Sequence, residues 1–377
     1  MLGGYFDNAA TTELCDAAKQ AMTGAMGCFG NPSSLHKLGL ESMQLLETAR
    51  QTVADQLKCE KREIYFTSGG TEADNIAIFG AAQRGRRMGN KIVTTAIEHA
   101  AVLEPMRELE KQGFAVVYLK PDKNGNIDLC AFEDAIDENT ILVSAMSVNN
   151  ETGAMLPVEQ LKNVIRRKNA PALLHCDCTQ SFLKYPVLPH RSGMDLVTVS
   201  AHKIHGPKGV GALFVSKDAR ILPHTFGGGQ ESGLRSGTEP LLLIAGFGAA
   251  VGAAGDPKEN LKKVLAVKTY LCDRFAADPE ILINSPENGS AYHLNISVPG
   301  IRSETMLHFL EDKGVYVSSG SACSKGKQSH VLQAMGLDRR RIDSALRISL
   351  SAYNTKEDAD MLLAGIAAAQ NSLIRSK

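Results

Sequence analysis

Short apolar runs recur between residues 60 and 216, and stretches with helical spacing separate most of them. A short run rich in β-branched and aromatic side chains is typical of a buried strand. Seven runs fit this description: 63–66, 91–96, 114–119, 141–148, 172–177, 195–200 and 211–216. Amphipathic stretches such as 71–85 and 158–168 lie between them. Because strands that alternate with helices form parallel sheets, the pattern predicts an α/β fold with a mostly parallel seven-stranded sheet flanked by helices.

The pattern changes after residue 216. A long helical pattern covers roughly 239–276, and the residues beyond it mix strand-like with helix-like stretches, namely 292–298, 303–314, 346–350 and 356–374. We expect these to form a smaller α+β domain, since 377 residues exceed what one hydrophobic core usually serves. The predicted division gives a large domain at 16–255 and a small domain at 1–15 and 256–377. Residues 34–57 are also strongly helical.

Composition narrows the class of protein. Hydrophobic residues make up 44% of the chain and charged residues 22%, as in soluble globular proteins. Lys plus Arg and Asp plus Glu both number 41, so a net charge of zero gives no overall attraction to nucleic acids or acidic membranes. The first residues lack signal-peptide features, and the longest apolar run, 241–255, is too short to span a membrane. Eight scattered cysteines without CxxC spacing predict free thiols and a cytoplasmic location.

The stretch SGGTEADN, residues 68–75, follows a predicted strand and opens a predicted helix. Gly70 and Thr71 stand where a helix start offers free N–H groups and the positive end of its dipole, which suits a phosphate. A plain helix N-cap turn explains these residues about as well. The stretch has neither the lysine spacing of a P-loop nor the GxGxxG pattern, so ATP and NAD both fit poorly.

A lysine and an aspartate stand at predicted strand ends, where α/β sheets bind their ligands. Lys203 follows the run 195–200 within a Gly-rich turn, and burial there would free its amine to form a Schiff base. Taken alone, most such lysines are solvated loop residues. Asp177 ends the run 172–177, where a carboxylate needs a cationic partner such as a protonated pyridine nitrogen, although a helix N-cap is the alternative. Strand alternation points the flanking cysteines away from Asp177, as packing residues.

Cys323 stands in SSGSACSKGKQSH, residues 318–330, among serines and glycines that cannot bury it. Lys325, Lys327 and His330 follow closely and would lower the pKa of its thiol. An exposed cysteine of no function is the alternative. The residues alone leave the two interpretations evenly balanced.

Ten strings in order resemble the cysteine desulfurase family of the class V aminotransferases, which are fold-type I pyridoxal phosphate enzymes. They run from residue 5 to about 350 and read YFDNAATT, GNPSSLH, TSGGTEADN, IEHAAV, SVNNETG, HCDCTQ, SAHKIHGPKG, GGGQESGLRSGTEP, SSGSACS and RISL. The resemblance implies the fold-type I fold, with a large α/β domain and a smaller α+β domain. It also implies pyridoxal 5′-phosphate as cofactor and L-cysteine as substrate.

The resemblance also implies a role for each matching residue. Lys203 would hold the cofactor, and His99 would stack on its ring and help to move protons. Asp177 would pair with the ring nitrogen, and Gln180 with the ring oxygen. Residues implied for the phosphate are Gly70, Thr71, Ser200 and His202, with Thr238 supplied by the neighbouring subunit of a homodimer. Residues implied for the substrate are Asn150 and Arg347 at its carboxylate, with Cys323 as the catalytic cysteine. No metal is implied.

The implied reaction converts L-cysteine to L-alanine and leaves the sulfur on Cys323 as a persulfide. An acceptor protein would then take the sulfur for iron–sulfur cluster assembly or tRNA thiolation; the SKGKQ loop leaves its identity open. A selenocysteine lyase or another class V aminotransferase is the nearest alternative, and a non-catalytic scaffold is a third. A metal enzyme fits worst, because the histidines at 99, 202 and 205 lack ligand partners at suitable spacing.

Overall fold

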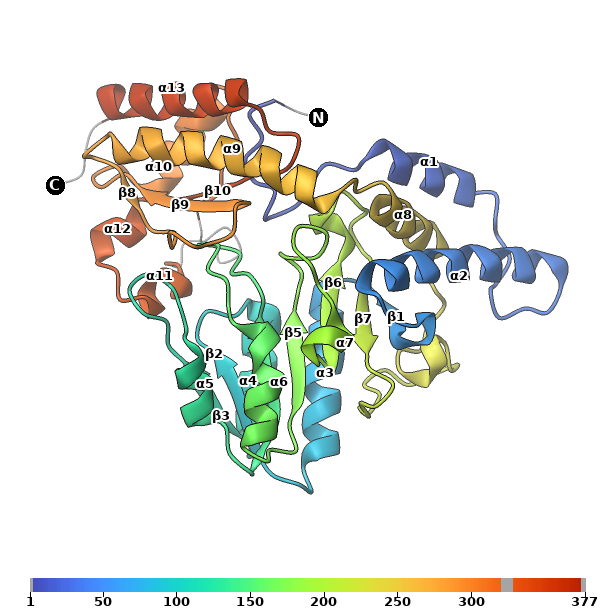
Figure 1. Cartoon of the computed structure of the whole chain (residues 1–377). Coiled ribbons are helices and arrows are strands. Elements are labelled where there is room, and N and C mark those ends of the chain that lie inside the picture. Colours follow the sequence, from blue (N-terminus) through green and yellow to red (C-terminus); the bar gives the residue numbers. More distant parts are fainter. Residues whose placement is uncertain (1–2, 320–327, 374–377) are drawn as a thin grey trace.

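The computed structural model describes residues 3–319 and 328–373 (Figure 1). Its strands are β1 (Ile64–Thr67), β2 (Lys91–Thr95), β3 (Ala115–Leu119), β4 (Thr140–Met146), β5 (Leu173–Asp177), β6 (Leu196–Ser200), β7 (Gly211–Val215), β8 (Leu282–Ile283), β9 (His293–Ser297) and β10 (Ala345–Ser349). Its helices are α1 (Asp16–Ala25), α2 (Lys37–Leu57), α3 (Gly70–Gly85), α4 (Ala100–Lys111), α5 (Leu129–Ala135), α6 (Val158–Arg167), α7 (Pro189–Ser192), α8 (Leu241–Gly252), α9 (Pro257–Ala276), α10 (Ser303–Glu311), α11 (His330–Ala334), α12 (Arg339–Asp343) and α13 (Lys356–Ser372).

The larger sheet has seven strands in the order β1-β7-β6-β5-β4-β2-β3. Strands β2 to β6 pair in parallel, whereas β7 is antiparallel to both β6 and β1. Each of the seven apolar runs forms one of these strands, so the predicted mostly parallel sheet is confirmed. Because β2, β4, β5 and β6 run in parallel, their carboxyl ends meet at one edge of the sheet.

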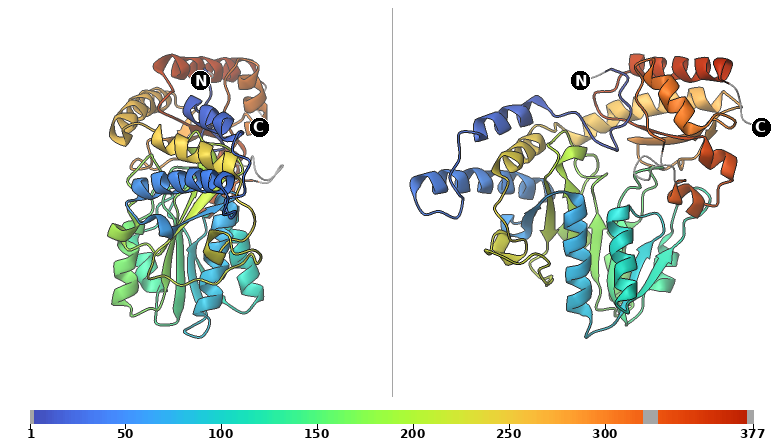
Figure 2. Two further views of the ribbon diagram at one scale, coloured as in Figure 1. Left: turned by 90° about the vertical axis from the view of Figure 1, so that its right-hand side faces the viewer. Right: turned by 180° about the vertical axis from the view of Figure 1, so that it is seen from behind.

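Helices cover both faces of this sheet. Helices α2, α6 and α8 pack on one face, around residues such as Leu161 and Phe247. Helices α3 and α4 pack on the other, around Ile76 and Met106, and lie in front of the sheet when it is seen from behind (Figure 2). Successive side chains of a strand point to opposite faces. On β5, Cys176 joins the first of these cores, so its neighbours in the strand turn toward α3.

A smaller sheet, in the order β10-β9-β8, is antiparallel throughout. Helices α9, α10 and α13 cover it and enclose a separate core with residues such as Phe275, Leu346 and Leu362 (Figure 1). Phe6 belongs to the same core, so the N-terminal segment packs with residues far later in the chain. Helices α11 and α12 instead pack on the large core. The domain division near residue 255 stays a prediction.

The helical pattern at 239–276 forms two helices rather than one. Helix α8 ends at Gly252, and Gly255 then takes a φ of 72°, which favours glycine. Asp256 caps the next helix by accepting a hydrogen bond from the Lys258 N–H at 2.9 Å, and Pro257 occupies its first turn. Within the described residues, no helix combines the length and apolarity needed to cross a membrane.

Candidate active site

A cavity of about 280 Å³ opens at the carboxyl ends of the parallel strands. The N-terminal segment and β10 of the smaller sheet also contribute to its wall, through Ala9, Ala10 and Arg347. Ten of the residues expected at the site line this one cavity: Gly70, Thr71, His99, Asn150, Asp177, Gln180, Ser200, His202, Lys203 and Arg347. Residues more than 270 positions apart in sequence are thus brought together as predicted, while their roles stay to be tested.

One end of the cavity suits a phosphate group. Helix α3 begins there at Gly70, so its first N–H groups have no partner within the helix. A Cβ added at Gly70 would lie only 3.2 Å from Thr179 Oγ1, so glycine keeps this corner open. The Ser200 hydroxyl is buried and has no hydrogen-bond partner among the described residues. An anion with several oxygens would satisfy both the hydroxyl and the helix terminus.

His202 borders this end as a neutral ring. Burial lowers its pKa to about 4, with smaller contributions from the charges of Lys203 and Lys208. Its Nδ1 lies 3.3 Å from Thr11 Oγ1. A neutral imidazole can still donate one hydrogen bond to an anion, but it adds no charge.

The amine of Lys203 faces the N-terminal segment across the cavity. Lys203 lies in a short 3₁₀ turn directly after β6, and its Nζ donates to the carbonyl oxygens of Ala9 at 2.6 Å and Ala10 at 2.8 Å. Backbone carbonyls hold the amine without neutralising it as a carboxylate would. The lysine is therefore positioned by the fold before any ligand binds.

Asp177 ends β5, and its Oδ1 accepts a hydrogen bond from the Thr179 N–H at 2.9 Å. Gln180 follows in the next turn, where its Nε2 donates to the Ala9 carbonyl at 3.0 Å. Its Oε1 lies 3.2 Å from His293 Nε2. Both side chains are buried and fixed by the backbone around them, so they can orient a planar ring without rearranging.

His99 caps helix α4, because its Nδ1 accepts a hydrogen bond from the Ala101 N–H at 3.1 Å. In a neutral ring the proton must then sit on Nε2. Burial lowers the pKa of His99, and the nearby charge of Asp177 only partly opposes this. The ring is neutral at physiological pH and can donate from Nε2.

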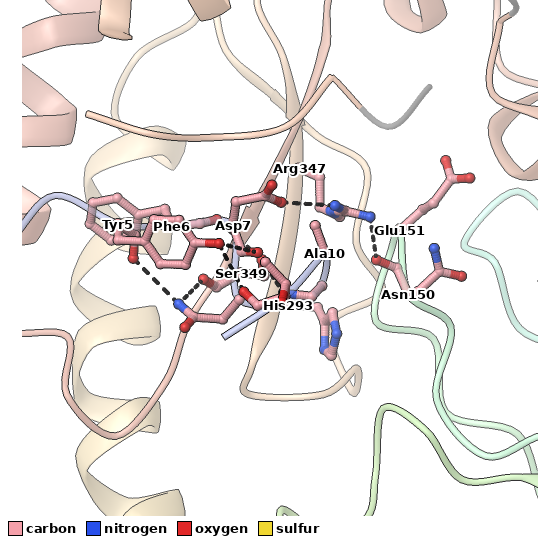
Figure 3. A network of polar contacts seen from close by, with 12 residues as sticks. Tyr5, Phe6, Asp7, Ala10, Asn150, Glu151, His293, Arg347 and Ser349 are labelled. Atoms are coloured by element: carbon pink, nitrogen blue, oxygen red, sulfur yellow. Dashed lines mark hydrogen bonds and ion pairs between the residues drawn. The ribbon is translucent and has the colours of Figure 1, made fainter. Parts of the chain in front are cut away.

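Arg347 enters the cavity from β10 and is almost fully buried. Figure 3 shows its guanidinium between Asp7 and Asn150, with Nη2 at 2.8 Å from Asp7 Oδ1 and Nη1 at 3.4 Å from the Asn150 carbonyl oxygen. Its Nε is buried and has no hydrogen-bond partner in the part of the chain that is described. The arginine thus retains an unused donor.

Two expected residues remain, of which only Thr238 is described. Thr238 is exposed and does not line the cavity. Cys323 lies outside the described residues, but both flanks of its segment are placed. Before it, Ser318 pairs with Arg347 through two backbone hydrogen bonds of 3.1 and 2.7 Å. After it, His330 Nε2 lies 3.0 Å from the carbonyl oxygen of Glu98, the residue before His99. The described residues on either side of the segment thus lie beside Arg347, which lines the cavity, and beside Glu98, the neighbour of His99.

A match to the class-V aminotransferase family model covers residues 4–362. The chain belongs to this family. Cysteine desulfurase IscS of Glaesserella parasuis is 39% identical over 94% of the chain and 90% of that protein, and the putative cysteine desulfurase IscS 1 of Bacillus subtilis is 40% identical over 94% of each. Among solved structures, a NifS-like protein is 38% identical with a TM-score of 0.93, covering 99% of this chain and all of that one. The chain thus falls within the cysteine desulfurase group of the class-V aminotransferases.

Class-V aminotransferases of this group depend on pyridoxal 5′-phosphate, and the cavity fits it. The free Ser200 hydroxyl and the α3 terminus suit its phosphate, Asp177 suits its ring nitrogen, and Lys203 suits its aldehyde. The predicted fold, cofactor and enzyme class are confirmed.

Sequence reasoning missed three buried titratable groups beside this class-V site. Asp74 lines the cavity one turn into α3, His175 precedes Asp177 on the same face of β5, and Glu98 precedes His99. All three are 1% exposed or less. The signal for Asp74 was its spacing of four residues from Gly70, which places both on one side of a helix. The other two show no signal until the fold is known.

Glu98 makes stability depend on pH. Burial raises its pKa to about 8 from 4.5, although hydrogen bonds from Thr95 and the Met146 N–H oppose this. Between these values the unfolded chain loses the proton while the folded protein keeps it, so stability falls as pH rises. Glu98→Gln removes the ionisable group and therefore this fall in stability with rising pH. We expect it to raise the melting temperature relative to wild type by about 4 °C more at pH 8 than at pH 5. Exposed Glu159→Gln is the control, and an equal effect of Glu98→Gln at both pH values would contradict the expectation.

Proposed function

We propose that this class-V enzyme converts L-cysteine to L-alanine and transfers the sulfur as a persulfide on Cys323. The observation that carries the proposal is the convergence of Lys203, Asp177, His99 and Arg347 on one cavity beside both flanks of the Cys323 segment. A solved relative, SspA in complex with cysteine, supports the substrate: it is 32% identical with a TM-score of 0.82, covering 93% of this chain and all of that one.

The residues that would hold the cofactor divide by its parts. Lys203 would bind it covalently, Asp177 would pair with the ring nitrogen, Gln180 would donate to the ring oxygen, and the neutral His99 ring would stack on its face. Residues for the phosphate are Gly70, Thr71, Ser200 and His202. When bound, pyridoxal phosphate supplies an electron sink for bonds at the substrate's α-carbon.

The protein's own part is to hold and move protons. Lys203 Nζ, once released from the carbonyls of Ala9 and Ala10, would serve as the base. His99 donates from Nε2, because its Nδ1 is occupied by the Ala101 N–H.

Arg347 would bind the substrate carboxylate, helped by Asn150. Its unpartnered Nε is a donor that a carboxylate can use, and the planar guanidinium suits two parallel hydrogen bonds.

Arg347→Lys keeps the charge but loses this geometry, so we expect KM for L-cysteine to rise about 30-fold, with a smaller change in kcat. Steady-state kinetics would measure both. In the control Asp7→Asn, Arg347 stays in place, and KM should change less; an equal rise would assign the role to the ion pair instead.

In the proposed transfer, the Cys323 thiolate forms a bond with the substrate sulfur as the bond from that sulfur to the β-carbon breaks. Alanine then leaves, and an acceptor protein takes the sulfur for iron–sulfur cluster assembly or tRNA thiolation. The positions of Ser318 and His330 support this, since these flanking residues lie beside Arg347 and Glu98.

A homodimer with shared sites would explain the position of Thr238, which would reach the partner's phosphate. Large apolar side chains stand exposed near it and in the loop before α2: Phe226 is 81% exposed, Phe29 82% and Leu35 92%. We expect light scattering to give twice the chain mass of 40.4 kDa. Phe226→Ser with Leu35→Ser should shift the mass toward one chain. A single-chain mass for wild type would contradict the shared site.

The unpaired state of the cysteines is the reason for proposing a cytoplasmic location. Cys176 and Cys178 have their sulfurs 3.4 Å apart on β5 and its end, yet form no disulfide, and the other described cysteines are also free. Unpaired thiols this close are typical of a reducing compartment.

Product stoichiometry tests the proposed reaction. Purified holoenzyme with L-cysteine and a thiol reductant should release alanine and sulfide in equal amounts. Alanine without sulfide is expected of a different aminotransferase and would contradict the proposal. Much faster turnover of L-selenocysteine, with little from L-cysteine, would favour the lyase alternative.

A further inference from the structure

Asp74 is a buried carboxyl group with no assigned part in the reaction. It extends from the second turn of α3 into the floor of the cavity and is 1% exposed. Its Oδ1 has no hydrogen-bond partner among the residues described. The nearest cationic candidate is His175 Nε2, at 3.5 Å, which is too long for a good hydrogen bond.

His175 connects Asp74 to the sheet beneath Asp177. The ring is fully buried, with Nδ1 at 2.8 Å from Ser144 Oγ and Nε2 at 3.1 Å from Thr198 Oγ1. Both ring nitrogens thus face hydroxyl groups, which can donate or accept. Burial lowers the pKa of His175 to about 4, and the charge of Asp177 opposes this only in part. A neutral ring cannot serve as the counterion of an ionised Asp74.

The groups around Asp74 disfavour its ionised form. Burial raises its pKa well above the usual range, and the negative charge of Asp177 raises it further, against a hydrogen bond with Thr198. Glu98, from the start of α4, interacts with Asp74 and is itself protonated near neutral pH. The positive end of the α3 dipole favours an anion, but by much less than burial disfavours one. Lys203 and Arg347 line the same cavity with partners of their own.

We propose that Asp74 is a positioning residue that keeps its proton beside the neutral ring of His175, so that the negative charge at this end of the cavity stays on Asp177. Two close buried carboxyl groups cannot both ionise, so one must hold a proton. Asp74 is the group that keeps the proton, because the Thr179 N–H already stabilises the ionised form of Asp177. The proposal rests on the proposed function, in which Asp177 pairs with the ring nitrogen of the cofactor. A protonated ring nitrogen needs an ionised carboxylate as its partner.

Infrared difference spectroscopy tests the protonation directly. At pH 7, wild type minus Asp74→Asn should show the carbonyl band of a protonated carboxyl group, and this band should shift when wild type is moved into D₂O. Asp195→Asn is the matched control, because Asp195 pairs with Lys162 at 2.5 Å and should lose only carboxylate bands. Carboxylate bands in the Asp74 difference, with no D₂O-sensitive carbonyl band in that same difference, would overturn the proposal. Burial also raises the pKa of Glu98 and of Glu151, so each of them can contribute a similar band. In a chain that carries Glu98→Gln and Glu151→Gln the D₂O-sensitive band of Asp74 should remain, and its absence there would overturn the proposal even where Asp74→Asn folds poorly.

The visible absorbance of the bound cofactor provides the functional readout. Since an amide resembles a neutral carboxyl group, Asp74→Asn should keep the wild-type midpoint when that absorbance is titrated with pH. If Asp74 were ionised in wild type, Asp74→Asn would remove a negative charge close to the cofactor and shift the midpoint by about one pH unit. This result would also overturn the proposal. Neither readout involves cysteine, so they separate a failure of this inference from a failure of the proposed desulfuration.

Discussion

Replacing Lys203 by alanine should abolish the visible absorbance of the covalently bound cofactor and lower alanine formation at least about 1,000-fold. The reason is that Nζ would both form the bond to the cofactor and act as the base. Absorbance spectra of the purified protein measure the first effect, and single-turnover assays with L-cysteine measure the second. Lys208→Ala is the matched control, since Lys208 is exposed in the turn that follows.

A persisting absorbance band in Lys203→Ala would point to another amine. Lys184 is the candidate, because burial lowers its pKa to about 7, assisted by the charge of Lys203. Its Nζ lies 3.4 Å from Gln180 Oε1, close to the cofactor cavity. Loss of the band in Lys184→Ala but not in Lys203→Ala would show that the cofactor lysine is wrongly assigned.

Replacing Cys323 by alanine should lower sulfide release from L-cysteine at least about 100-fold while leaving the cofactor absorbance unchanged. The thiolate is the proposed nucleophile, whereas the residues proposed for the cofactor belong to the large sheet and the turns and helices that follow its strands. Methylene blue assays of sulfide, paired with spectra, measure the two effects. Cys130→Ala is the control, because Cys130 is an exposed cysteine on α5.

Full sulfide release from Cys323→Ala would contradict the persulfide. It would favour a lyase that expels the chalcogen directly, and a better rate with L-selenocysteine would support that interpretation. Loss of the cofactor band in the same variant would instead mean that the 320–327 segment helps to hold the cofactor.

Asp177, Lys203 and Gly70 share one property that local pattern could reveal: each stands at the end or start of a predicted element. Asp177 and Lys203 follow apolar runs, and Gly70 opens a helix, so local pattern was enough to place them at one edge of the sheet. The sequence analysis missed the break at Gly255 and Pro257, although glycine and proline in sequence commonly separate helices.

The contacts that sequence analysis could not supply are tertiary ones. Arg347 meets Asp7 across 340 residues, and Asp74 meets His175 because α3 packs on the face of β5 that carries the odd-numbered side chains. Apolar neighbours make His175 look like a core residue. Its partners on β4 and β6 appear only once strand order and register are known.

The N-terminal segment has a consequence for how the protein is made. Asn8 donates to the carbonyl oxygen of Ser349 on β10, and Ala9 and Ala10 receive the amine of Lys203. The large sheet, by contrast, is complete once Val215 has emerged from the ribosome. Because domains fold as units during synthesis, this sheet can form before β10 has been translated. Residues 3–10 then still lack their partners on β10. Pyridoxal phosphate would then be captured late, after the ribosome has delivered β10, and nascent chains stalled before residue 345 should bind it weakly.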